Sequence, residues 1–176
     1  MLFGKILAEA AMRETKFVTW LPAYGAEVRG GTAYCMVAVS DTEIGSPHID
    51  KADTLIILNK PSLEKFKDRI KNKGLLILNT SLMTKKELIP YINMWQKKVH
   101  LVEYPFTDIA IEIGNIRVAN MVALGCFIGS RKIVSEKSVI ETIHAVAPLD
   151  KRNLIMINEK ALSSGMQLIK HKNDKS

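Results

Sequence analysis

The sequence predicts an α/β fold with three layers, in which helices cover both faces of a mostly parallel sheet. Two short segments, residues 53–59 (DTLIILN) and 74–81 (GLLILNTS), have uninterrupted apolar centres. Strands that are buried on both faces have this composition, and they are typical of parallel sheets. The segment between them has apolar residues at helical spacing, so the three segments together predict a strand–helix–strand unit.

The chain is expected to begin with a helix and two strands. Residues 5–14 (KILAEAAMRE) are rich in alanine and present an apolar face, which favours a helix. Residues 16–22 (KFVTWLP) predict a short strand that is ended by Pro22. Residues 32–40 (TAYCMVAVS) form a nearly continuous run of strand-forming residues.

The helix of the strand–helix–strand unit has recognisable signals at both ends. Pro61 suits the first helical turn, and Gly74 suits the stop. Between them Leu63, Phe66 and Ile70 recur at helical spacing, so all three are expected on one helix.

The next segments predict a short helix and another strand. Thr84 and Glu87 have the spacing of a capping box, in which each residue caps the other's backbone at a helix start. Pro90 either shortens this helix or begins it. Residues 98–106 (KVHLVEYPF) then predict a further strand.

The C-terminal third is expected to be mainly helical. Residues 108–129 have a long helical pattern that is apolar on most sides, which predicts a buried helix. Ser135 is a suitable N-cap for a following helix over residues 135–146. Residues 153–158 (NLIMIN) predict a short strand or extended segment, and residues 158–170 predict a terminal helix. Because no repeat or linker is evident, residues 1–176 are expected to form one domain.

The predicted order of elements is unusual at its start. A Rossmann-like, doubly wound domain usually opens with a strand and a glycine-rich turn that leads into the first helix. Here the first helix is expected almost at Met1. The sequence therefore predicts a Rossmann-like sheet whose first strand and glycine-rich turn are missing.

Composition indicates a cytoplasmic protein that binds neither membranes nor nucleic acid. Hydrophobic residues make up 47% of the chain and charged residues 24%. The apolar runs are shorter than the roughly 20 residues of a membrane span, and no signal peptide is evident. The net charge of +7 comes from lysines mixed with acidic residues, without the interleaved aromatic residues of a nucleic-acid surface.

No catalytic or metal-binding pattern is evident in the sequence. Only two cysteines are present, Cys35 and Cys126, whereas an iron–sulfur cluster takes about four. The sequence has no Cys-x-x-Cys pair, no Gly-x-Ser-x-Gly motif and no P-loop. The four histidines are isolated from one another: His48, His100, His144 and His171. The chain is therefore expected to have no catalytic centre and no metal of its own.

The segment YGAEVRGG at residues 24–31 is the first candidate site. Its candidate residues are Tyr24, Gly25, Glu27, Arg29, Gly30 and Gly31. In one interpretation the glycines allow a tight connection between two strands. In the other the segment is a recognition loop, in which the planar guanidinium of Arg29 binds a carboxylate or phosphate.

A second candidate site lies in GNIRVAN at residues 114–120. Asn115, Arg117 and Asn120 are polar residues within an otherwise apolar segment. Buried polar groups need hydrogen-bond partners. The asparagines are expected either to satisfy loop backbone or to face residues 24–31 or another subunit.

Five motifs in this order resemble one known family. They are GKILAEAA, YGAEVRGG, SDTEI, KADTLIILN and GNIRVANMVALG. Together they resemble the gamma subunit, or gamma domain, of 2-oxoacid:ferredoxin oxidoreductases, the pyruvate and 2-oxoglutarate synthase group. The resemblance covers about residues 4–130.

This resemblance implies a supporting role in a larger enzyme. Such a holoenzyme oxidatively decarboxylates a 2-oxoacid with coenzyme A, giving an acyl-CoA, carbon dioxide and reduced ferredoxin. Thiamine diphosphate, magnesium and iron–sulfur clusters are then expected in partner subunits, namely alpha, beta and in some enzymes a ferredoxin-like delta subunit. The isolated chain is expected to be inactive, and 2-oxoglutarate is favoured over pyruvate or branched-chain substrates. Both candidate sites would serve the subunit interface.

One departure and one alternative accompany the resemblance. Family members usually carry a strand and a GxGGQG-type turn before GKILAEAA, where this chain has only MLF. We therefore expect that the native start lies further upstream, or that another segment or subunit fills the gap. The alternative function is an autonomous nucleotide- or CoA-binding module that uses the Arg29 loop.

Overall fold

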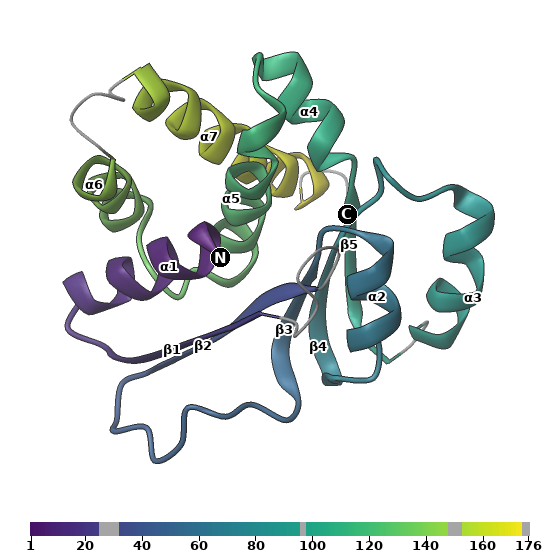
Figure 1. The fold of residues 1–176 in the computed structure, drawn as a ribbon, viewed down its shortest axis with the longest axis horizontal. Coiled ribbons are helices and arrows are strands. Elements are labelled where there is room, and N and C mark those ends of the chain that lie inside the picture. The colour runs from purple at the N-terminus through teal and green to yellow at the C-terminus, as the bar shows by residue number, and fades with distance from the viewer. Residues whose placement is uncertain (25–31, 96–97, 148–152, 174–176) are drawn as a thin grey trace.

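The computed structural model describes residues 1–24, 32–95, 98–147 and 153–173, and it has three layers (Figure 1). The elements in chain order are α1 (Leu2–Arg13), β1 (Phe17–Tyr24), β2 (Ala33–Ser40), β3 (Ala52–Ile57), α2 (Lys60–Phe66), β4 (Ile70–Asn79), α3 (Lys85–Trp95), β5 (His100–Tyr104), α4 (Phe106–Ile113), the 3₁₀ turn η1 (Ile116–Val118), α5 (Ala119–Arg131), α6 (Glu136–Val146) and α7 (Asn153–Asn173). Helices α2 and α3 cover one face of the strands, and the remaining helices cover the other. The three-layer α/β prediction is confirmed.

The strands form two sheets among the described residues. Strands β3, β4 and β5 are parallel and adjacent in that order, so Ile77 of β4 lies between Ile56 of β3 and Val102 of β5. Strands β1 and β2 form a separate antiparallel pair. The predicted parallel unit β3–α2–β4 is therefore confirmed, whereas the single sheet is divided.

Alternate residues of β4 supply two hydrophobic cores. Leu75 and Ile77 point to a first core, built with α1, α4, α5, α6 and α7. Leu76 and Leu78 point to a second core, built with α2 and α3. Since successive side chains of a strand point to opposite faces, a strand buried on both faces needs an unbroken apolar run. This requirement explains the predicted composition of β4.

The helix α2 is shorter than its periodicity suggested. Its start agrees with the prediction, because Pro61 lies in the first turn and Asn59 caps the helix. It ends at Phe66, and Ile70 instead begins β4, where it pairs with Ala52 of β3. Gly74 lies within β4. The assignment of Ile70 to the helix and of Gly74 to its stop is therefore wrong.

Two prolines lie inside elements that they were expected to limit. Strand β1 continues through Pro22 to Tyr24, so the predicted end at Pro22 is wrong. Proline is tolerated there because β1 pairs only with β2 among the described strands and leaves its other edge open. Helix α3 likewise runs through Pro90, although its predicted capping box at Thr84 and Glu87 is confirmed.

The C-terminal third contains two further corrections. The continuous helix expected over residues 108–129 is interrupted at Gly114, whose φ of +110° ends α4, and η1 then leads into α5. Residues 153–158 form the first turns of α7, so the prediction of an extended segment is wrong. The N-cap at Ser135 is confirmed, because its side chain accepts a hydrogen bond from the Ser138 N–H.

Helices α5 and α7 cross in direct backbone contact at two glycines. A Cβ atom placed on Gly125 would lie 1.9 Å from the carbonyl oxygen of Leu162. A Cβ atom on Gly165 would lie 2.0 Å from the carbonyl oxygen of Val122. The crossing therefore requires glycine on both helices. Among the helices that the structure describes, none combines the length and apolar character needed to cross a bilayer.

Candidate functional site

The first candidate segment is described only at its first residue. Tyr24 is the last residue of β1, it pairs with Ala33, and its side chain is 74% exposed. Leu21 on the same strand is also exposed. The other candidate residues of this segment lie outside the described residues: Gly25, Glu27, Arg29, Gly30 and Gly31.

The second candidate segment forms the turn between α4 and α5. The Asn115 side chain accepts a hydrogen bond from the Arg117 N–H at 3.0 Å. The Asn115 N–H donates in turn to the carbonyl oxygen of Ala110. Asn115 therefore satisfies loop backbone, which was one of its two predicted roles. Asn120 is half-buried at the start of α5, and its side chain has no hydrogen-bond partner within the described part of the chain.

Apolar side chains are exposed beside Arg117. Ile111 and Ile116 are 55% and 57% exposed, and the Arg117 side chain is exposed as well. We call Ile111, Ile116 and Arg117 the α4–α5 patch. No hydrogen bond or ion pair joins Tyr24 to this patch within the described ranges.

The carboxyl ends of the parallel strands are closed by a polar cluster. Ligands of open α/β sheets usually bind at this edge. Here the Asn79 amide, only 2% exposed, donates to the Leu58 carbonyl oxygen at 3.1 Å and to the Thr107 hydroxyl at 2.9 Å. The Ser81 hydroxyl accepts from the N–H groups of Thr107 and Asp108, both at 3.1 Å. Two N–H groups in the first turn of α4 are thus already bonded within the protein.

Three other helix N-termini are capped by the side chain of the residue that precedes the helix. The cap residues are Asn59 for α2, Thr84 for α3 and Ser135 for α6. Free N–H groups at such ends are what bind phosphate. These four helix ends therefore give no support to the alternative of a nucleotide-binding module.

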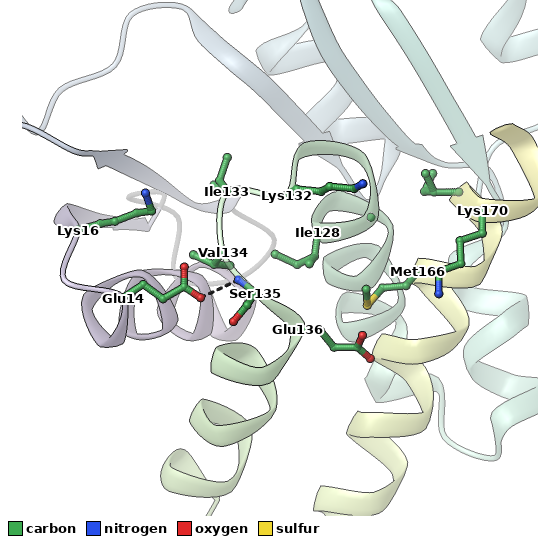
Figure 2. A pocket seen from close by; sticks show the side chains of 12 residues that line it. Glu14, Lys16, Ile128, Lys132, Ile133, Val134, Ser135, Glu136, Met166 and Lys170 are labelled. Carbon is green, nitrogen blue, oxygen red and sulfur yellow. Dashed lines mark hydrogen bonds between the residues drawn. The ribbon is translucent and has the colours of Figure 1, made fainter.

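A pocket of about 600 Å³ lies where α1, α5, α6 and α7 meet (Figure 2). Ile128, Met166 and Ile169 contribute its apolar lining. In Figure 2, Glu14 and Lys16 lie at one end of the pocket and Lys170 at the other. The lining residues come from three segments far apart in the chain, so no sequence motif indicated this pocket.

Two charged residues of the pocket, Glu14 and Lys16, have structural contacts. The Glu14 carboxylate accepts a hydrogen bond from the Ser135 N–H at 2.7 Å, and this bond lowers the pKa of Glu14. Lys16 forms an ion pair with Asp41 at 2.7 Å. Glu14 therefore acts as a hydrogen-bond acceptor that joins the end of α1 to the start of α6.

Acidic, histidine and cysteine side chains are dispersed in the structure. Within residues 1–24, 32–95, 98–147 and 153–173, no three of them gather where they could hold a metal ion.

Comparisons with known proteins give a consistent result. The profile of the family described as pyruvate ferredoxin/flavodoxin oxidoreductase matches residues 1–168. Ketoisovalerate oxidoreductase subunit VorA of Methanothermobacter thermautotrophicus is 32% identical over 165 residues, which cover 93% of this chain and 32% of that protein. The chain thus spans about a third of that relative's length.

A second relative and a solved structure match over most of their length. The 2-oxoglutarate synthase subunit KorC of Methanocaldococcus jannaschii is 32% identical over 174 residues, which cover 97% of this chain and 87% of that protein. The crystal structure of the gamma subunit of a keto/oxoacid ferredoxin oxidoreductase from Geobacter sulfurreducens superimposes with a TM-score of 0.78. It is 25% identical, and the match covers 97% of this chain and 90% of that chain.

Proposed function

Because this chain belongs to the pyruvate ferredoxin/flavodoxin oxidoreductase family, we propose that it is the gamma subunit of a multi-subunit 2-oxoacid:ferredoxin oxidoreductase. Its residues 1–176 would form one gamma-type domain. The complete enzyme would decarboxylate a 2-oxoacid and join the acyl group to coenzyme A, while two electrons pass to ferredoxin. The observation that supports this most directly is the family match over residues 1–168.

In this proposal the chain has a structural role through its contacts with companion subunits, and those subunits provide the reactive groups. Thiamine diphosphate, magnesium and iron–sulfur clusters would be bound by the alpha, beta and any ferredoxin-like delta subunit. The length of VorA supports a close association, because only 32% of that protein corresponds to this chain. A segment that relatives carry within a longer polypeptide is suited to permanent contact with the rest.

Two exposed surfaces are proposed as contacts with the companions. One is the end of β1 at Tyr24, and the other is the α4–α5 patch. Interface centres are enriched in tyrosine and arginine, with apolar residues around them. Each surface exposes a residue of this kind: Tyr24 is 74% exposed at the end of β1, and the exposed Arg117 follows the exposed Ile116.

For the substrate we propose 2-oxoglutarate. The support is the alignment with the KorC subunit, which spans nearly all of both chains. VorA, which is named for ketoisovalerate, is equally identical over a shorter part of its own length. A purified native complex that is offered 2-oxoglutarate, pyruvate and ketoisovalerate separately should show its highest kcat/KM with 2-oxoglutarate. A higher value with either competitor would overturn this assignment.

The subunit role is tested by tagging the chain in its native cell. The tagged chain should bring down thiamine- and cluster-containing subunits, and the eluate should reduce ferredoxin when both a 2-oxoacid and coenzyme A are present. The chain purified alone should show no oxidation of 2-oxoacids. Turnover by the isolated chain, or its recovery as a nucleotide-loaded monomer without companions, would contradict the proposal.

A further inference from the structure

Exposed basic side chains gather at the amino ends of the parallel strands, opposite the polar cluster around Asn79. Where β3 and β4 begin, the Ala52 N–H donates to the Arg69 carbonyl oxygen at 2.9 Å. The Lys73 N–H donates to the Lys98 carbonyl oxygen at 2.6 Å, just before β5. These backbone contacts bring three segments together. With the end of α5 they form a surface that we call the basic edge: Lys51, Arg69, Lys71, Lys73, Lys98 and Arg131.

Most of this positive charge has no acidic partner in the described part of the chain. Lys71 is paired with Asp53, whose two carboxylate oxygens each lie 3.0 Å from its ammonium. The Arg131 guanidinium donates instead to neutral acceptors, the Asp53 carbonyl oxygen at 2.9 Å and the Thr54 hydroxyl at 3.2 Å. Within the described ranges, no ion pair includes the other four residues: Lys51, Arg69, Lys73 and Lys98. The acidic residues of the same segments are fewer: Asp50, Asp53 and Asp68. The basic edge therefore has an excess of positive charge.

Part of the basic edge lies on a protrusion of β4. The register of β3 and β4 shifts between Ala52 and Thr54, so residues 71–74 of β4 lie opposite a single residue of β3. Within this bulge Lys73 has a φ of +61°, a left-handed conformation that glycine or asparagine adopts more readily than lysine. Bulges and strained residues are common at functional sites. An exposed lysine in this conformation is better suited to contact with another molecule than to folding.

The basic edge lacks the apolar residues of a permanent interface. Large apolar side chains are exposed elsewhere in the described chain, for example at Ile111 and Ile116, but none belongs to the basic edge or to the described residues adjacent to it. The centres of stable interfaces are depleted of charge and enriched in aromatic residues, whereas weak redox encounters bury small areas. The basic edge is therefore suited to a partner that has an acidic surface and binds reversibly.

We propose that the basic edge guides an acidic electron carrier, the ferredoxin, to the assembled enzyme, an inference that rests on the proposed function. In that function the companion subunits stay bound, whereas the carrier must bind and leave in each cycle. The clusters of the companion subunits would supply its electrons, so the basic edge acts on the encounter and not on electron transfer. Complementary surface charge raises association rates by about 10–10³-fold at low ionic strength.

The test uses the purified native complex and a ferredoxin from the same cells. The test variant combines Lys73→Glu with Lys98→Glu, because both side chains are exposed and neither has an ion-pair partner among the described residues. We expect its KM for ferredoxin to rise at least tenfold at about 50 mM salt, while kcat and the KM for the 2-oxoacid stay unchanged. The difference from wild type should shrink at about 500 mM salt, because salt screens the attraction.

The matched control variant combines Lys137→Glu with Lys160→Glu. It has the same net charge as the test variant, but its exposed residues lie on α6 and α7, away from the amino ends of β3 and β4 (Figure 1). Its KM for ferredoxin should stay within about twofold of the wild-type value. All three enzymes should reduce methyl viologen equally fast, because this small cationic acceptor has no acidic surface to be guided.

The outcomes separate this inference from the proposed function. An unchanged KM for ferredoxin in the test variant, or an equal rise in the control variant, would overturn the inference alone if methyl viologen is reduced normally. A wild-type complex that fails to reduce methyl viologen would overturn the proposed function as well. Loss of companion subunits from the test variant would make the basic edge a subunit contact, and nucleic acid that co-purifies only with the wild type would make it a nucleic-acid surface. Either result would overturn the inference.

Discussion

At the residue scale, Gly125 and Gly165 decide how closely two helices approach. A methyl carbon added to either glycine would lie only 1.9 or 2.0 Å from a carbonyl oxygen of the facing helix, so it would push α5 and α7 apart. We expect Gly125→Ala to lower the free energy of unfolding by about 1–3 kcal/mol or more, as overpacked cores do. Urea denaturation followed by circular dichroism measures this change.

Gly45→Ala is the matched control for that substitution. No atom lies within 4 Å of a Cβ placed on Gly45, so the change is expected to stay within about 0.5 kcal/mol. Equal denaturation midpoints for Gly125→Ala and Gly45→Ala would contradict the close crossing.

A second residue-scale prediction concerns the Lys60–Glu87 pair. The Lys60 ammonium lies 2.6 Å from the Glu87 carboxylate oxygen, and the Thr84 N–H donates a hydrogen bond to the same carboxylate. Together they lower the pKa of Glu87 from 4.5 to about 2. The ionised carboxylate therefore stabilises the fold above the unfolded pKa of 4.5, and this contribution is lost as the pH falls towards 2. We expect Glu87→Gln to lower the melting temperature at pH 7 and to have little effect near pH 2.

The upper pH limit of the same contribution follows from Lys60. The Glu87 carboxylate raises the pKa of Lys60 above 10.5. The stabilising effect of the Lys60 charge is therefore complete below pH 10.5 and is lost only as the pH rises further. The melting difference between wild type and Glu87→Gln should therefore be flat from about pH 5 to 10. Glu43→Gln, in an exposed loop, is the control and should show no such profile. A difference that persists unchanged at about pH 2 would show that the effect is not ionic.

At the element scale, the turn that separates α4 from α5 depends on Gly114. Its φ of +110° is strained for any residue with a side chain, although no atom would contact a Cβ there. Gly114→Ala is therefore expected to cost roughly 1–2 kcal/mol through the backbone alone. Chemical denaturation checks this value, and a cost no larger than that of Gly45→Ala would refute it.

The sequence predicted most elements but misplaced several of their ends. The helix start at Asn59 and Pro61 and the capping box at Thr84 were predictable, because they depend on neighbouring residues. Ile70 was not, because its spacing from Phe66 suits a helix while its pairing with Ala52 depends on a residue far away in the chain. A local pattern does not contain such long-range pairing.

The apolar segments were ambiguous for another reason. Residues 153–158 are apolar enough for a strand, yet as the start of α7 they bring Ile155 and Ile157 against the first core. Short apolar runs do not distinguish a strand from one face of a helix. The pocket around Ile128 and Met166 was also beyond sequence analysis, because tertiary packing brings its three segments together.

At the scale of the whole molecule, the proposed subunit contacts lead to a prediction about assembly. Tyr24→Asp and Ile116→Asp change residues that are 74% and 57% exposed, so the stability of the isolated chain should shift by less than about 0.5 kcal/mol. If these residues are interface anchors, each substitution should reduce recovery of companion subunits at least tenfold.

Leu82→Asp is the control for those two substitutions. Leu82 is also apolar and 62% exposed, but it lies outside both proposed surfaces. Its tagged variant should recover companions as the wild type does. Equal recovery by all three variants would contradict the proposed contact surfaces.

The crossing of α5 and α7 also limits how the protein can be shortened. Residues 4–130 contain the recognisable motifs, but a fragment that stops there would leave the groove along Val122, Gly125 and Cys126 facing solvent. Such a fragment would expose an apolar surface and would tend to aggregate. Helix α7, which contains none of the recognisable motifs, is therefore needed to cover α5, which contains part of the last motif.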